Sequence, residues 1–318
     1  IKKINNLISN INENKKKLIF IENNIIFNRD NNIFFKINNS LVKINNDNKK
    51  KELIINGKFL NNKIFIKLST KLNNKNNLIV QIPKLDLLAK IFFKAKSSGN
   101  TVGSLDLEIL NNFLKLNFIK SNDIKIKNGF IRSRLINSSM NGEITLKPNF
   151  FLKLDLKPSS LIVEKLFPLI QKKYFSTNEN EAPLIKKING LFNFKSKFDG
   201  SVITENGEII FKDFKIGKKK SLNFNAKITE FGKKGKIQFN VTKIFQHKKK
   251  SHNRIEIKGY IIPYNNKVVF QKFFLNDTLV PVKKIKDYED KFRREVVQKS
   301  IKNIFNEKKL NKYFKSLI

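Results

Sequence analysis

The side chains that could do chemistry in this chain are few, and their spacing is typical of solvent-facing positions. Asp106 and Glu108 are two carboxylates that could in principle serve as a general acid and a general base. In a strand, residues two apart share one face, and the alternation of Leu105, Leu107 and Ile109 with the carboxylates predicts that their face meets water. A general acid needs a pKa that a cleft has raised. The pair therefore does not predict an enzyme.

Metal and nucleophile chemistry lacks its usual residues. The chain has no cysteine and only two histidines, His247 and His252, on either side of the lysines at 248–250. Zinc and thiolate sites need Cys or His in larger sets, and no phosphate-cradling loop or nucleophile elbow is present. We expect an exposed loop at 247–252, no metal, no cofactor and no catalytic residue.

The charge of the chain is strongly basic. Its 318 residues include 65 Lys and Arg against 26 Asp and Glu, a formal net charge of +39. This balance favours a polyanionic partner. However, only six of the cations are Arg, the residue that reads bases and phosphates with its forked guanidinium, and Lys, Asn, Ile and Phe all have AT-rich codons. Genome composition is thus the competing explanation, and we expect no specific nucleic acid.

Alternation of apolar and polar residues runs through most of the chain. Clean examples are residues 64–68, 152–156, 222–228 and 237–241. A period of two over short runs predicts antiparallel strands with one face on solvent. Asn-Gly pairs readily take positive φ, so we expect a turn between strands at each of the five pairs. They are Asn56-Gly57, Asn128-Gly129, Asn141-Gly142, Asn189-Gly190 and Asn206-Gly207.

Three segments break the alternation with apolar residues at helical spacing. They are residues 85–93, 160–174 and 286–305. The second contains Pro168, which should bend or shorten the helix. The third has an apolar stripe at steps of three and four, which predicts an amphipathic C-terminal helix. The predicted fold is mainly β, a long twisted antiparallel meander curled into a groove, with short helices and this C-terminal helix.

Residues 176–183 (STNENEAP) form the best linker, because they are polar and lack periodicity. They separate an N-terminal β-groove module with two short helices, residues 1–175, from a C-terminal β-meander module that ends in a helix, residues 184–318. One continuous sheet through both modules is the alternative. The chain begins at Ile1 and has no run of roughly 20 apolar residues that could span a bilayer. We therefore expect the natural N-terminus, with any anchor, upstream.

Residues 140–171 (MNGEITLKPNFFLKLDLKPSSLIVEKLFPLIQ) resemble the AsmA-like family of bacterial envelope proteins. That family shows four elements in this order: a strand that opens on Gly-x-Ile, a Pro turn, a Leu-x-Leu-Asp-Leu strand and a short helix. Residues 18–68 are similar to the family's early repeats, which close on a Gly-x-Phe segment, and residues 207–214 are similar to strand entries near its C-terminal region. The resemblance covers most of the chain, but no single motif is specific.

This resemblance implies a protein anchored in the bacterial inner membrane, on its periplasmic face. It also implies an apolar trough that conducts phospholipid between the envelope membranes or supports outer-membrane assembly. The family carries no catalytic residues. The implied partners are therefore phospholipid and a membrane, with the anchor upstream of Ile1.

The predicted helices are too few to cover the apolar face of so many strands. Either the strands pack into a closed core, as in a structural or scaffold protein of the envelope, or they leave an apolar groove that marks a binding surface. Acyl chains suit such a groove, because each buried CH₂ contributes about 0.8 kcal/mol. The groove candidates are Ile64, Ile66, Leu68, Leu152, Leu154, Phe192, Phe194, Phe198, Leu222, Phe224, Ile228 and Phe239.

The predicted C-terminal helix also carries cations. In one interpretation they meet anionic headgroups at a membrane surface; in the other, the helix simply packs across one end of the sheet. The membrane-surface candidates are Lys283, Lys284, Lys286, Lys291, Arg293 and Arg294.

Overall fold

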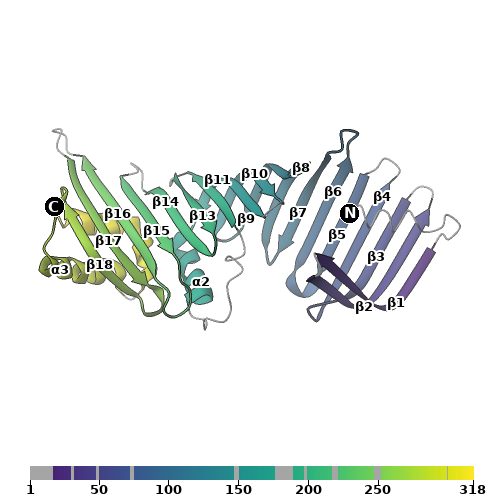
Figure 1. Cartoon of the computed structure of the whole chain (residues 1–318), viewed down its shortest axis with the longest axis horizontal. Helices are drawn as coiled ribbons and strands as arrows, with labels where there is room; N and C mark the ends of the chain where they lie inside the picture. The colour runs from purple at the N-terminus through teal and green to yellow at the C-terminus, as the bar shows by residue number, and fades with distance from the viewer. Residues whose placement is uncertain are drawn as a thin grey trace. The chain divides into compact units, whose positions relative to one another are not determined.

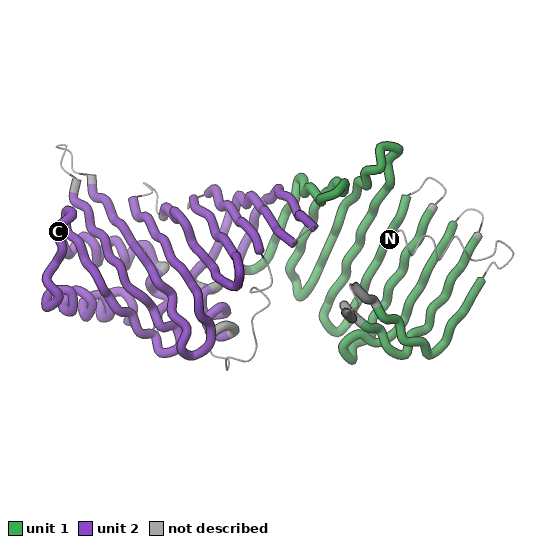
Figure 2. Tube along the Cα trace, in the orientation of Figure 1, with its two compact units in different colours: residues 1–134 green, residues 135–318 purple. Residues whose placement is uncertain are grey.

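A computed structural model describes residues 17–29, 32–47, 50–71, 75–146, 150–175, 189–196, 199–216, 221–246, 252–298 and 300–318. Strands dominate these residues, and the 19 strands belong to one hydrogen-bonded sheet (Figure 1). The predicted class, mainly β and antiparallel with short helices and a helical C-terminus, is confirmed. The chain divides into two compact units, residues 1–134 and 135–318 (Figure 2).

Unit 1 is a meander in which each strand pairs antiparallel with the next. Its one described helical element is the single turn η1 (Pro83–Leu85). Its strands are β1 (Lys17–Arg29), β2 (Asn32–Asp47), β3 (Lys50–Phe59), β4 (Asn62–Lys71), β5 (Lys75–Ile82), β6 (Leu87–Ala95), β7 (Thr101–Ile109), β8 (Asn112–Lys120) and β9 (Ile124–Arg132).

The helix expected at residues 85–93 is wrong, because strand β6 occupies most of that segment. Both faces of β6 carry apolar residues: Ile91 lies opposite Leu105 on one face, while Phe92 is exposed on the other. An apolar run of this length fits a helix or a strand equally well. Pairing with β5 and β7 decides the outcome.

The hairpin of β1 and β2 bends sharply in its middle. Glu22 and Asn39 both have positive φ, 55° and 47°, at places where the strand register shifts. At the bend the Ser40 hydroxyl donates a hydrogen bond to the Asn23 carbonyl oxygen at 2.7 Å. The far half of the hairpin therefore packs onto the apolar face of unit 1, where Ile37 is completely buried.

Unit 2 contains the remaining strands and nearly all of the helices. Its strands are β10 (Ile136–Thr145), β11 (Phe151–Leu161), β12 (Asn189–Lys195), β13 (Asp199–Glu205), β14 (Glu208–Ile216), β15 (Leu222–Ile228), β16 (Ile237–Gln246), β17 (His252–Ile262), β18 (Lys267–Leu275) and β19 (Thr278–Leu279). Its helices are α2 (Val163–Phe175), η3 (Pro263–Asn265), α3 (Val282–Phe292), η4 (Arg293–Val297), η5 (Ile301–Phe305) and α4 (Glu307–Lys315).

Strands β11 and β12 are paired in parallel, whereas the other strand pairs with a described register are antiparallel. Their pairing carries the sheet past residues 176–183, where the sequence placed a boundary between modules. That segment lies outside the described residues, and the two compact units divide after Arg134 instead. The boundaries of the units and of the expected modules therefore differ.

The C-terminal helices pack over the apolar face of the unit 2 strands. Val296, Ile301, Tyr313 and Phe314 are almost completely buried in one cluster with residues of β14–β18 and α2. The prediction for residues 286–305 is correct in that their apolar stripe is buried, but the segment is not one continuous helix. Gln298, with φ 50° and ψ −119°, ends the first helical stretch. Pro168 lies inside α2, which continues to Phe175.

Of the five Asn-Gly pairs, only Asn206-Gly207 forms a turn between strands, so the expectation fails for the other four. At Asn128, φ is 50° and the register of β8 and β9 shifts, which marks a β-bulge. The other three pairs lie within strands, where glycine permits close packing. A Cβ at position 57 would lie 2.5 Å from a methyl carbon of Ile37, and one at position 142 would lie 2.8 Å from Leu154.

Candidate functional site

Two unbroken rows of aliphatic side chains cross one face of unit 1, each residue directly opposite the next across paired strands. The first row is Ile44, Leu53, Leu68, Leu78, Ile91, Leu105 and Leu116. The second row is Val42, Ile55, Ile66, Val80, Ala89, Leu107, Leu114 and Ile131. Neither row contains a polar residue. At about 4.8 Å between strands, the second row runs for roughly 34 Å.

The bent hairpin covers only the first part of these rows. Ile25 and Ile37 pack against Ile55, Ile66 and Val80 in a small cluster of their own. After η1, the described part of unit 1 contains no further helix, and the row residues from Leu78 in β5 onward are partly exposed. We call this second part the open apolar face. Its residues are Leu78, Ile91, Leu105, Leu107, Leu114 and Leu116.

The opposite face of the same strands is mixed, with charged side chains among exposed phenylalanines such as Phe92 and Phe113. Asp106 lies across from Lys115, with 3.7 Å between carboxylate and ammonium, and its side chain is substantially exposed. Glu108 shares this face by strand alternation. The two carboxylates therefore lie on the side of the sheet away from the open apolar face, and they do not line a cleft together with it.

The groove candidates of the sequence fall into three environments. In unit 1, Ile64 and Leu68 are buried and Ile66 is partly buried. Ile64 belongs to the cluster under the bent hairpin, and Ile66 packs against that cluster. On β11 and β12 of unit 2, four candidates are partly exposed on one face, where Leu154 lies opposite Phe192: Leu152, Leu154, Phe192 and Phe194. Phe198 lies outside the described residues.

The remaining four candidates belong to the closed core of unit 2. Leu222 and Ile228 are buried there, and Phe224 and Phe239 pack against the same core. A cavity of about 60 Å³ lies between these strands and the C-terminal helices. Ligand pockets usually measure about 300–1,000 Å³. The helices therefore seal this part of the sheet instead of leaving room for an acyl chain.

The row residues of β5–β8 were not among the predicted site residues. The sequence identified Leu105 and Leu107 only as members of an alternating strand. What makes them a site is their register, since Leu105 lies between Ile91 and Leu116, and Leu107 between Ala89 and Leu114. Strand register depends on the three-dimensional pairing, and alternation within one strand does not reveal it.

The cations of the C-terminal helix divide into two groups. Lys291 donates a hydrogen bond to the Ser316 carbonyl oxygen at 3.1 Å, and Arg293 pairs with Glu289 at 2.5 Å. The others are exposed, and three of them follow Val282, whose side chain is 82% exposed. The exposed cations that make neither of these contacts are Lys283, Lys284, Lys286 and Arg294. Their role at a membrane surface stays a prediction.

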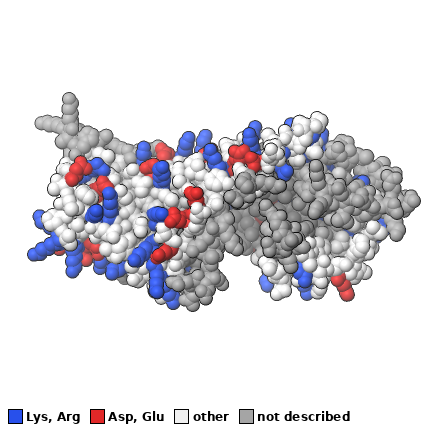
Figure 3. Space-filling model, in the orientation of Figure 1, with Lys and Arg blue, Asp and Glu red and all other residues white. Residues whose placement is uncertain are grey.

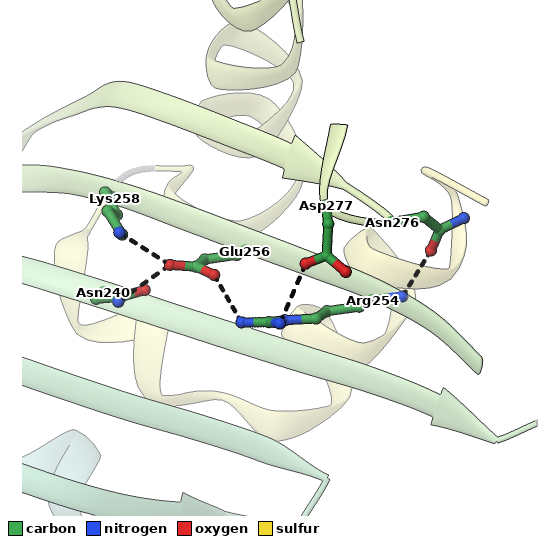
Figure 4. Close-up of polar contacts among 6 residues, drawn as sticks. All are labelled: Asn240, Arg254, Glu256, Lys258, Asn276 and Asp277. Atoms are coloured by element: carbon green, nitrogen blue, oxygen red, sulfur yellow. Dashed lines mark hydrogen bonds and ion pairs between the residues drawn. The ribbon is translucent and has the colours of Figure 1, made fainter. Parts of the chain in front are cut away.

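The charges on the polar face of unit 2 are largely paired (Figure 4). Arg254 bridges Glu256 at 2.9 Å and Asp277 at 3.1 Å, and Lys258 contacts Glu256 at 3.1 Å. Burial alone raises the pKa of the Glu256 carboxyl, but hydrogen bonds from Lys258 and Asn240 and the nearby cations outweigh it and lower that pKa. A carboxylate held ionised in this way is a structural ion-pair partner, unsuited to donate protons.

Basic side chains do not form a single block on the visible face of unit 2. Figure 3 shows Lys and Arg interspersed with Asp and Glu there. One further cation, Lys243, is buried on the apolar side of β16, where its ammonium donates a hydrogen bond to the Ser221 hydroxyl at 2.6 Å. Burial lowers the pKa of Lys243, against the opposing influence of Glu307. On the face drawn in Figure 3, this mixture of signs differs from the basic surface of a nucleic-acid binder.

The described residues contain no cluster of three or more His, Asp or Glu side chains placed to hold a metal ion. Within the same residues, no helix is both long and apolar enough to cross a bilayer. Comparisons with protein-family models, with curated proteins and with solved structures find no match to this chain. Any assignment of function therefore depends on the geometry of the sheet itself.

Proposed function

We propose that the protein binds the acyl chains of phospholipids along the open apolar face of unit 1. One observation carries this proposal: two adjacent rows of aliphatic side chains, uninterrupted by any polar residue, continue beyond the hairpin that covers their beginning. Partly exposed aliphatic residues arranged contiguously, in contrast to scattered ones, mark a binding surface.

The dimensions of the rows fit an acyl chain. One leaflet of a bilayer has a hydrocarbon layer of about 15 Å, half of a roughly 30 Å core. The open apolar face, from β5 to β8, spans three strand spacings, roughly 14 Å at 4.8 Å per strand. Each CH₂ that leaves water contributes about 0.8 kcal/mol wherever it lies along the row. Because no polar side chain fixes a headgroup position, the face would hold many lipids and permit movement along it.

The proposed place of this activity is the periplasmic face of the bacterial inner membrane, in an AsmA-like protein that conducts phospholipid or supports outer-membrane assembly. The resemblance of residues 140–171 to that family supports this part of the proposal, and nothing in the fold adds to it. The scaffold alternative draws support from unit 2, where the C-terminal helices close the core.

The test is uptake of a fluorescent phospholipid by the delipidated full chain. Ile91→Asp places a charge in the first row, and Phe92→Asp, the matched control, places it on the opposite, exposed side of the same strand. We expect Ile91→Asp to reduce uptake by at least about tenfold, the equivalent of 1.4 kcal/mol, and Phe92→Asp to leave it nearly unchanged. Equal uptake by both variants would refute the proposal.

A second measurement covers the case in which Ile91→Asp does not fold. An acyl chain with a photoreactive group is crosslinked to the wild-type protein, and the labelled peptides are identified. We expect labels within residues 78–116. Labels confined to unit 2, or native protein that binds neither the lipid nor an apolar dye, would favour the closed scaffold.

A further inference from the structure

Three turns at one end of the unit 1 strands carry leucines that face solvent. Leu60 joins β3 to β4, Leu85 joins β5 to β6, and Leu110 joins β7 to β8. Their side chains are 76%, 37% and 59% exposed. In a meander, alternate connections lie at the same end of the strands, so these leucines follow one edge at steps of roughly 10 Å. We call Leu60, Leu85 and Leu110 the leucine rim.

The other end of the same strands has a different character. The connections described there are residues 96–100, Lys-Ser-Ser-Gly-Asn between β6 and β7, and residues 121–123, Ser-Asn-Asp between β8 and β9. Both are entirely polar, as surface turns usually are. Among the connections that the structure describes in unit 1, the exposed leucines therefore lie at one end of the strands.

Two of the rim leucines hold a conformation that leucine disfavours. Leu60 and Leu110 each have φ 47°, at the first central position of a two-residue hairpin turn. In unit 2, Asn206 and Asn276 occupy the same turn position with φ 48°. Asn tolerates positive φ, whereas a branched apolar side chain does so at a cost. Neither turn geometry nor burial explains the two leucines, so another interaction must.

Cations flank the rim. Lys58 lies directly opposite Lys63, one position behind the Leu60 turn, and both are exposed. Opposed like charges destabilise a strand pair, and unit 1 also holds such pairs away from the rim, as at Lys50 with Lys71. Lys84 precedes Leu85, and Arg132 ends β9 beside β8; both are exposed. The acidic residues nearest the rim in sequence are Asp86 and Glu108.

We propose that the leucine rim docks on the surface of a bilayer that contains anionic lipid, with the three leucines inserted among the acyl chains and the flanking cations on the headgroups. Leucines spaced roughly 10 Å apart leave gaps that a protein partner would have to fill. A fluid bilayer accepts each side chain separately, and its anionic headgroups match the cations. This docking does not depend on acyl-chain binding at the open apolar face, and it can be measured without it.

The experiment is flotation of the full chain with vesicles of phosphatidylcholine alone or with phosphatidylglycerol added. The test variant is Leu60→Asn/Leu85→Gln/Leu110→Asn, and a second variant is Lys58→Gln/Lys63→Gln/Lys84→Gln. The control is Leu169→Gln, which removes an equally exposed leucine from helix α2. Fluorescent-lipid uptake is measured on the same samples, so that loss of docking and loss of lipid binding are distinguished.

We expect each leucine that the variant removes to weaken binding to both kinds of vesicle by at least tenfold. The lysine variant should lose roughly fivefold per cation, and only with phosphatidylglycerol present. Leu169→Gln should bind like the wild type. Unchanged binding by the leucine variant would overturn the proposal. So would a result in which only Val282→Asp, beside the exposed lysines of α3, abolishes binding.

Discussion

Replacing the two strained rim leucines with asparagine should make unit 1 more stable. Leu60→Asn and Leu110→Asn keep the two-residue turns and supply the residue that Asn206 and Asn276 already provide at equivalent positions. Substitutions at exposed leucines of ordinary conformation change stability by less than about 0.5 kcal/mol in either direction. The expected gain therefore comes from the backbone.

The magnitude follows from the left-handed conformation, which costs a residue with a Cβ roughly 1–2 kcal/mol. Asn avoids much of this cost, so we expect a gain of about 1 kcal/mol at each turn. Leu60, at 76% exposed, contributes little burial that the substitution could remove. The two turns are four strand spacings apart, roughly 19 Å, and such distant substitutions are additive. The double variant should gain about 2 kcal/mol.

The assay is urea unfolding of the full chain, followed by a probe in unit 1. With a slope of about 2 kcal/mol per molar urea, the double variant should move the unit 1 midpoint up by roughly 1 M. The reverse substitution Asn206→Leu, at the same turn position with φ 48°, should lower the unit 2 stability by about 1 kcal/mol. A lower midpoint for Leu60→Asn, or no change in either direction, would refute the account of strain at this turn.

Three further predictions concern packing and charge. Phe292→Ala should destabilise unit 2 by about 3–5 kcal/mol in urea unfolding, because the ring packs 5.3 Å from that of Phe270, while Val282→Ala on the exposed side of the same helix should have little effect. Gly103→Ala should cost about 1–3 kcal/mol, since a Cβ there would lie 2.6 Å from the Phe118 ring. Lys243→Met should be more stable than the wild type at pH 7. Its advantage should shrink as pH rises toward the ordinary lysine pKa of 10.5, because the unfolded chain binds the proton that burial disfavours.

Much of the architecture was predictable from residue patterns. Period-two alternation identified most strands, and the apolar stripe of residues 286–305 predicted the burial of Phe292, Val296 and Ile301. The stripe did not extend to the buried Tyr313 and Phe314 of α4. Local sequence patterns gave wrong predictions where the same pattern fits two different local structures. The run at residues 87–93 fits either period, and Asn-Gly suits a bulge, as at Asn128, as well as a turn.

The candidate site was harder to predict, because alternation looks the same in a sealed sheet and in a partly exposed one. Leu222 and Leu105 lie in runs with equally clean alternation, yet Leu222 is buried under the C-terminal helices and Leu105 is partly exposed. Which strands a distant helix covers depends on tertiary contacts. A list of apolar strand positions therefore mixes core residues, such as Ile228, with residues of a surface.

Departures from local preference are the more specific signal for function in such a chain. A sheet with one buried face needs apolar alternation to fold, so alternation alone does not distinguish residues that stabilise the fold from residues that bind a ligand. A leucine in a tight turn at positive φ has no folding advantage, and a lysine opposite a lysine has none either. Opposed lysines also occur away from the rim, as at Lys50 with Lys71 and Lys75 with Lys94, so the leucines at positive φ carry the argument. Because positive φ brings an exposed leucine no folding benefit, the proposed insertion of Leu60 and Leu110 into a bilayer accounts for the strain that both turns hold.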